Sequence, residues 1–229
     1  QTLATVSLAG GNITGTGTLT ANTGFNIQSG SISAVLAGTG ALIKSGGGVF
    51  SVTGNNTYSG KTIVQDGTVS FDNASATGTN TQALGTNASV DLGVALSTSG
   101  TLNYTGAAGT FAKNIKALGS GNNTVMNTGG GLLTLAGTIT KNGTVLVLAG
   151  GTGGIQVDGV INGTAANSDL ILNGGNITLN ATNTYNGPTF VNNTNLTLAV
   201  ADALPGALIL DATSTMAMGA NQTMGALTG

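Results

Sequence analysis

The chain has 229 residues, of which 40 are glycine, 5% are charged and 3% are aromatic, and its formal net charge is -2. Because 40% of its residues are apolar and so few are charged, its composition differs from that of disordered segments, and we expect it to fold. It contains no histidine, cysteine, tryptophan, arginine or glutamate, which excludes disulfides, thiolate metal sites and most catalytic side chains.

Short segments in which apolar and polar residues alternate recur along the chain and predict β-strands. Glycine-rich and asparagine-rich pairs such as Asn142-Gly143 and Asn186-Gly187 separate them and favour tight turns. No segment has the periodicity of a helix. The predicted strands are 49–52, 69–71, 133–135, 145–148, 170–172, 177–179, 196–198 and 208–210.

The predicted strands recur at a nearly constant spacing. Ile171, Phe190 and Ile209 follow one another at intervals of 19 residues. Such a step is typical of a solenoid, in which each coil pairs with the coils before and after it. The sequence therefore predicts an all-β fold, a right-handed single-stranded parallel β-helix (β-solenoid) with about 19–20 residues per coil and roughly eleven or twelve coils. The stretches 74–87 and 105–123 are less regular and predict a looped-out excursion or a coil of different length.

We expect residues 1–229 to form a single β-solenoid domain. The sequence begins with Gln1, and the strand-and-turn pattern continues to its last residues, so we expect a segment of a longer chain. The longest apolar run, 145–149, is far too short for a membrane helix, and we expect no membrane span in this segment.

An internal repeat stands out within this pattern. The tract Gly-Asn-Asn-Thr-Tyr-Ser-Gly-Lys-Thr at 54–62 returns at 181–189 as Ala-Thr-Asn-Thr-Tyr-Asn-Gly-Pro-Thr. An exposed tyrosine could stack on a sugar ring or a partner protein, but its place in a repeated turn favours packing against the coil. The residues of this structural repeat motif are Asn56, Thr57, Tyr58, Gly60, Thr62, Asn183, Thr184, Tyr185, Gly187 and Thr189.

Residues 38–71 resemble the autotransporter-associated β-strand repeat, over the run Gly-Gly-Gly-Val-Phe-Ser-Val-Thr-Gly-Asn-Asn-Thr-Tyr-Ser-Gly and its flanks. Residues 169–205 resemble it more loosely, and 129–137 resemble the leading half of a third copy. The resemblance implies a right-handed β-helix in a secreted passenger region or another large bacterial surface protein, outside the cell. It implies no enzyme and no catalytic residues.

Three functions are compatible with these features. The first is a structural or adhesive segment that acts as a rigid stalk or spacer. The second is a self-assembling extracellular filament or sheath, joined through the solenoid ends. The third is a polysaccharide-binding or polysaccharide-degrading β-helix. A host or cell-surface glycan or protein is the expected partner, whereas five dispersed lysines without arginine argue against nucleic acid.

The sequence offers little for catalysis or for metal binding, and we expect no catalytic residue, no cofactor and no metal. Asp66 and Asp72 lie near Lys61 in the sequence, but solvated turn aspartates are the favoured interpretation. The run 150–158 resembles a calcium-binding nonapeptide only in its glycines, because Ile155 occupies the position of the aspartate. Since few side chains titrate between about pH 5 and 9, we expect stability to change little across that range.

Overall fold

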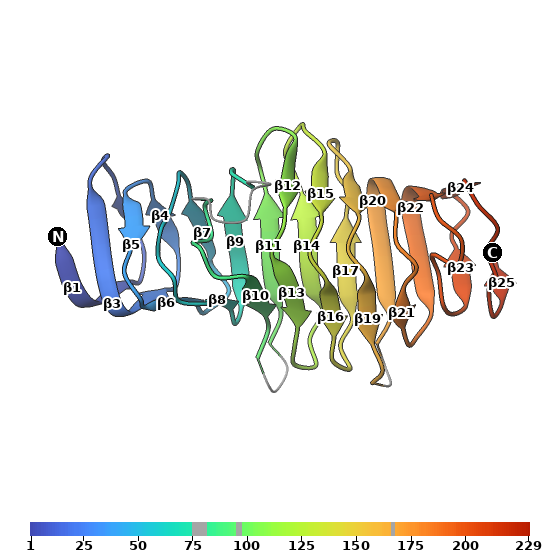
Figure 1. The fold of residues 1–229 in the computed structure, drawn as a ribbon, viewed down its shortest axis with the longest axis horizontal. Coiled ribbons are helices and arrows are strands. Elements are labelled where there is room, and N and C mark those ends of the chain that lie inside the picture. The colour runs from blue at the N-terminus through green and yellow to red at the C-terminus, as the bar shows by residue number, and fades with distance from the viewer. Residues whose placement is uncertain (75–81, 95–97, 166–167) are drawn as a thin grey trace.

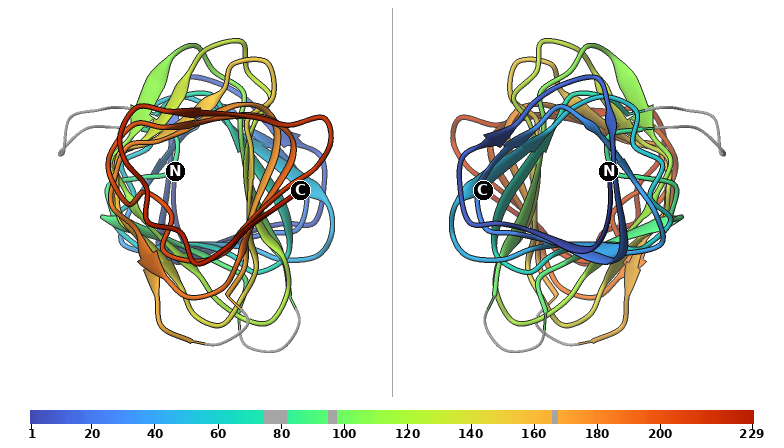
Figure 2. Two further views of the ribbon diagram at one scale, coloured as in Figure 1. Left: turned by 90° about the vertical axis from the view of Figure 1, so that its right-hand side faces the viewer. Right: turned by 90° about the vertical axis from the view of Figure 1, so that its left-hand side faces the viewer.

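The computed structural model describes residues 1–74, 82–94, 98–165 and 168–229. These residues form 25 strands and no helix, and so contain no helix long and apolar enough to cross a membrane. The strands stack into an elongated body with the chain termini at opposite ends (Figure 1). Viewed along the long axis, the chain traces a ring, and successive coils lie one behind the next (Figure 2). The fold is a parallel β-solenoid of about 11 turns, which confirms the predicted fold class.

The named strands pair in parallel with strands of neighbouring coils and form two sheets of ten and fifteen strands. The first sheet contains β1 (Thr2–Leu8), β3 (Thr18–Ile27), β5 (Val35–Ala37), β6 (Ala41–Lys44), β8 (Thr62–Val64), β10 (Ser89–Leu92), β13 (Asn114–Ala117), β16 (Ile139–Lys141), β19 (Ile161–Gly163) and β21 (Thr184–Tyr185). The second contains β2 (Asn12–Ile13), β4 (Gly30–Ile32), β7 (Val49–Val52), β9 (Gly67–Phe71), β11 (Gly100–Tyr104), β12 (Gly109–Phe111), β14 (Asn123–Asn127), β15 (Leu133–Leu135), β17 (Leu146–Ala149), β18 (Ile155–Val157), β20 (Leu170–Leu179), β22 (Thr189–Leu198), β23 (Leu208–Leu210), β24 (Thr215–Met218) and β25 (Leu227–Thr228).

The second sheet covers two faces of the solenoid, because β20 continues around a corner. Its first residues pair with β17 and its last residues pair with β18. Gly174 and Gly175 stand at the corner with φ angles of 71° and 69°, a left-handed conformation that favours glycine. In the coils just before β20 the same two faces are formed by separate strands, β14 and β15 in one coil and β17 and β18 in the next. Each coil therefore contributes to three faces.

The coil length is less uniform than the sequence spacing predicts. Phe50 pairs with Val69, and Phe190 with Ile209, both at the predicted step of 19 residues. In the middle of the chain Thr68 pairs with Thr101, a step of 33 residues. The ladder between β9 and β11 is nevertheless continuous from Gly67–Gly100 to Phe71–Tyr104, so the register of the core is kept. The longer step agrees with the predicted looped-out excursion or coil of different length at 74–87, of which residues 75–81 lie outside the described residues.

The core is a narrow column of side chains that point inward from all three faces. In β15, Leu133 and Leu135 are buried while Thr134 between them is partly exposed, the alternation expected of a strand with one buried side. Aromatic residues pack together in one part of the column, where the ring centroid of Phe71 lies 5.3 Å from that of Tyr104 and 5.5 Å from that of Phe111. Burying each large apolar side chain contributes about 1.5–3 kcal/mol, so the stack is held by the sum of many similar layers.

Candidate functional site

The first copy of the repeat motif places an asparagine inside the solenoid. Asn56 is fully buried, and its Oδ1 accepts a hydrogen bond from the backbone N–H of Leu36, in the preceding coil, at 2.7 Å. Its Nδ2 donates to the carbonyl of Ala83, in the following segment, at 2.7 Å. One amide side chain thus forms hydrogen bonds with backbone groups on both sides of its own coil. A buried backbone group without a hydrogen-bond partner would destabilise the fold.

The second copy repeats this arrangement with different partners. Asn183 accepts a hydrogen bond from the N–H of Ile161 at 2.7 Å and donates to the carbonyl of Ala203 at 2.6 Å. Its side chain is also buried. The two asparagines therefore have one geometry, which links three successive levels of the stack.

The tyrosine of the motif also points inward, and its hydroxyl meets the threonine four residues later. Tyr58 and Thr62 are fully buried with their oxygens 2.7 Å apart, and those of Tyr185 and Thr189 are 2.5 Å apart. Burial raises the pKa of both phenols above the ordinary value. Since these hydroxyls contact each other inside the core, they are not available to stack on a ligand.

The remaining residues of each motif copy are a tightly packed glycine and an exposed threonine. A Cβ on Gly60 would lie 2.3 Å from the carbonyl oxygen of Gly40 in the preceding coil, so only glycine fits there. Gly187 has a φ of 100° and is equally restricted. Thr57 and Thr184 point to solvent. Apart from these two threonines, the motif packs the solenoid internally.

Sequence reasoning missed a second set of interior polar residues, the lysines. The five lysines are dispersed along the sequence, which gave no sign of burial, but Lys44 and Lys141 are fully buried and Lys113 is only 4% exposed. The ammonium of Lys44 donates to the carbonyls of Ser45 at 2.9 Å and Asp66 at 3.0 Å. Backbone carbonyls thus replace the water that a lysine normally keeps.

Burial changes the protonation of two of these lysines. Desolvation lowers the pKa of Lys113 to about 8 and that of Lys141 to about 7, with Asp169 partly opposing the shift of Lys141. The Nζ of Lys141 donates to the carbonyl of Ser168 and lies 4.4 Å from the centroid of the Tyr185 ring. Both values lie within the range in which the sequence predicts constant stability, so the buried lysines predict instead that stability changes with pH there.

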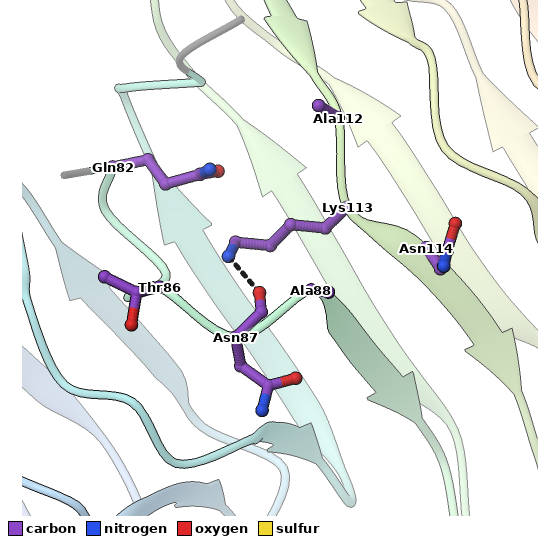
Figure 3. Close-up of a pocket in the computed structure, with 7 residues that line it drawn as sticks. All are labelled: Gln82, Thr86, Asn87, Ala88, Ala112, Lys113 and Asn114. Carbon is purple, nitrogen blue, oxygen red and sulfur yellow. Dashed lines mark hydrogen bonds between the residues drawn. The ribbon is translucent and has the colours of Figure 1, made fainter. Parts of the chain in front are cut away.

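A cavity of about 270 Å³ opens beside segment 82–88, and Lys113 lines it. The other lining residues are 82, 86–88, 112 and 114. Figure 3 shows the Lys113 side chain extending across the cavity to the 86–88 segment, where its Nζ donates to the carbonyl of Asn87. Nζ also donates to the carbonyl of Gly85 at 2.9 Å.

The carboxylates weighed in the sequence do not assemble into a catalytic pair. Asp66 accepts a hydrogen bond from the N–H of Gly67 at 2.9 Å, a local turn contact. Lys61 forms an ion pair with Asp91 at 2.9 Å, a partner that sequence proximity did not indicate. Among the residues that the structure describes, no group of three or more His, Cys, Asp or Glu side chains could hold a metal ion.

A row of apolar side chains lies on the outside of the second sheet. Val147, Ile171, Phe190 and Ile209 pair in successive coils and alternate with buried neighbours, so they share the outer face and are partly exposed. In earlier coils the same row starts with the exposed Val49 and continues with three threonines, the last of which, Thr124, pairs with Val147. The C-terminal half of this face is therefore more apolar than its N-terminal half. We call these four residues the outer apolar row.

Two comparisons find relatives of this chain. The passenger-associated-transport-repeat family matches residues 42–71 and 172–193, ranges that include both copies of the motif and are shorter than the resemblance seen in the sequence. The adhesin BmaC autotransporter of Brucella suis biovar 1 (strain 1330) is 40% identical over 89 residues, which are 39% of this chain and 2% of that protein. The matched stretch is thus a very small part of that relative. No solved structure matches the chain.

Proposed function

Because the chain carries the passenger-associated transport repeat and so is part of a secreted or surface protein, we propose that it is a rigid, non-enzymatic stalk on the bacterial outer surface. In this proposal all 229 residues form one solenoid domain of a longer surface protein, and the segment holds other parts of that protein away from the cell.

The observation that carries this proposal is the continuous stacking of coils together with the buried asparagine clamps, the hydrogen bonds by which Asn56 and Asn183 join neighbouring coils. Parallel ladders connect each coil with the next from β1 to β25. Asn56 and Asn183 add side-chain bonds that tie a coil to its neighbours on both sides. A rod that bends must break such bonds in a core where no water replaces them, so bending is costly.

Small-angle X-ray scattering of the purified chain tests the stalk. We expect the pair-distance distribution of an elongated particle, with a tail to a maximum dimension well above that of a compact protein of 229 residues. A compact or freely flexible particle would overturn the proposal. Growth of the particles into fibres with increasing concentration would instead support the filament function, in which the solenoid ends join.

A second function, adhesion, is favoured by the outer apolar row and by the name of the adhesin relative. A line of aliphatic and aromatic side chains on a stiff face can bury the apolar side chains of a partner protein. We expect beads coated with the chain to bind host cells, and the substitution of Phe190 by Asn to weaken that binding about tenfold. Substitution of Thr134, on another outer face, by Ala should leave it unchanged. Equal binding by both variants would contradict this function, and loss on glycosidase treatment of the cells would indicate a glycan partner.

A further inference from the structure

The five lysines of this chain occupy positions that a trypsin-class protease cannot use. Such enzymes cleave after lysine or arginine, because a carboxylate at the base of their specificity pocket binds the side-chain cation. The chain contains five lysines and no arginine, and all five lie in the described residues. Lys44, Lys113 and Lys141 are at most 4% exposed, so their side chains cannot enter a protease pocket while the solenoid is folded.

Hydrogen bonds between distant parts of the chain keep the buried lysines inside. The Nζ of Lys113 donates to the carbonyl of Gly85 at 2.9 Å, and that of Lys44 donates to the carbonyl of Asp66 at 3.0 Å. Turning either side chain outward would leave these carbonyls without their donor and open a void in the packed interior. Exposure of a buried lysine therefore requires local unfolding.

Lys116 has an exposed side chain, but its backbone lies inside a ladder. It belongs to β13, where it pairs with Asp91 of the preceding coil and with Thr140 of the following coil. A protease binds its substrate as an extended strand whose backbone pairs with the enzyme. Because β13 has a strand on either side, the peptide bond after Lys116 is closed to the enzyme.

Lys61 lies immediately before β8, and its side chain is 36% exposed. Its ammonium forms an ion pair with Asp91 at 2.9 Å, and its carbonyl accepts a hydrogen bond from the N–H of Leu42 at 2.9 Å. The next residue, Thr62, is fully buried and pairs with Leu42 and Val90 in the strands on either side. The peptide bond between Lys61 and Thr62 is therefore fixed at its two ends.

We propose that this placement of lysines makes the folded solenoid resistant to trypsin-class proteases, so that it persists intact where such enzymes are secreted. Exposed turns are the usual sites at which proteases cut a folded chain. Here they hold small uncharged residues, such as Ser-Gly-Gly-Gly at 45–48 and Thr-Gly-Gly-Gly at 128–131. The inference depends on where the lysines lie and not on the stalk function.

Digestion of the folded chain with trypsin tests the proposal. A synthetic peptide of residues 110–122 contains Lys113 and Lys116 without the ladders and gives the reference rate of cleavage. We expect the folded chain to be cleaved at least about 100-fold more slowly than the peptide, because only its locally unfolded fraction is a substrate. Mass spectrometry identifies the sites, and cleavage after Lys61 or Lys116 at a rate near that of the peptide would overturn the proposal.

Lysines introduced into exposed turns separate lysine placement from general rigidity. Gly130→Lys lies in the turn between β14 and β15, where a Cβ meets nothing within 4 Å. Trypsin should cut this variant into 1–130 and 131–229 at least about tenfold faster than it cuts the parent chain, as a denaturing gel would show. Gly47→Lys repeats the test in another exposed turn with equal space. If both variants resist like the parent, lysine placement does not protect the chain and the proposal fails.

A lysine introduced into a ladder is the matched control. Thr178→Lys places the same side chain at a partly exposed position of β20, between Gln156 and Thr197 of the neighbouring strands. This variant should resist trypsin like the parent chain, because its backbone is paired on both sides. Cleavage of Thr178→Lys as fast as Gly130→Lys would show that the ladders do not protect an exposed lysine, and would overturn the proposal.

Discussion

Lys141 and Tyr185 meet inside the solenoid, with the lysine Nζ 4.4 Å from the centroid of the tyrosine ring. The lysine comes from β16 and the tyrosine from the second copy of the repeat motif, two coils further on. The ring face is attractive to an ammonium, but burial opposes the charge more strongly, and the pKa of Lys141 falls to about 7. We therefore expect the stability of the solenoid to depend on pH.

Stability should rise with pH above neutrality. The folded pKa values of Lys141 and Lys113, about 7 and about 8, lie below the unfolded value of 10.5. At any pH between a lysine's folded and unfolded pKa values, the unfolded chain therefore binds more protons than the folded chain. The free energy of unfolding should be nearly constant below about pH 7. Each lysine should then add about 1.4 kcal/mol per pH unit once the pH exceeds its own folded pKa. Denaturation midpoints at pH 6, 8 and 9.5 measure this, below the range in which the phenols titrate.

A variant assigns the pH effect to its source. In Lys141→Met the rise that begins near pH 7 should disappear, whereas the rise that begins near pH 8 and belongs to Lys113 should remain. Asp169 and the ring of Tyr185 are unchanged in this variant, so they cannot account for the difference. A flat profile in the parent chain would show that the buried amines do not titrate in this range.

The hydrogen bond between the tyrosine and threonine hydroxyls of the motif should contribute more to stability in the second copy than in the first. Tyr185→Phe leaves the Thr189 hydroxyl buried without this partner and should cost about 1–3 kcal/mol. Tyr58→Phe should cost less, because Thr62 also donates to the carbonyl of Leu84 at 3.5 Å. In the double variant with Thr189→Val, most of the loss in the second copy should be recovered. Urea denaturation of the three variants checks the order, and equal losses in both copies would contradict it.

The asparagine clamp should be one of the most sensitive positions of the second copy. Asn183→Ala leaves the N–H of Ile161 and the carbonyl of Ala203 without their partner in a buried layer, which should cost about 2–4 kcal/mol. The neighbouring exposed Thr184 provides the control, since Thr184→Ala should change stability by less than about 0.5 kcal/mol. Thermal unfolding of both variants measures the difference between their losses of stability. Equal losses would show that the hydrogen bonds of Asn183 are dispensable.

Close approach of two coils makes Gly60 irreplaceable. A methyl group there would overlap the backbone of Gly40, so Gly60→Ala should cost about 3 kcal/mol or prevent folding. Gly47→Ala is the matched control, because a Cβ on Gly47 meets nothing within 4 Å. Circular dichroism and denaturation of the two variants distinguish them, and a stable Gly60→Ala would mean that the coils can separate locally.

The strand pattern was sufficient to predict the architecture. Alternating segments at a step of 19 residues, as for Phe50 and Val69, predict parallel stacking, and the ladders confirm it. The repeated tyrosine turn was recognised, but its internal bonds were not, because the partner of Asn56 lies 20 residues away and depends on register. Handedness stays a prediction from the rule for parallel crossovers.

By itself, the sequence determined the fold class, since small residues, alternation and periodic turns leave a stack of parallel strands as the way to bury the apolar side chains. Only the tertiary structure decided which polar residues enter the core. The lysines illustrate the reason: a lone charged residue normally predicts a solvated position, but Lys141 lies where a ring and a backbone carbonyl from later parts of the chain surround it. Such an environment arises from contacts between coils, which local sequence does not encode.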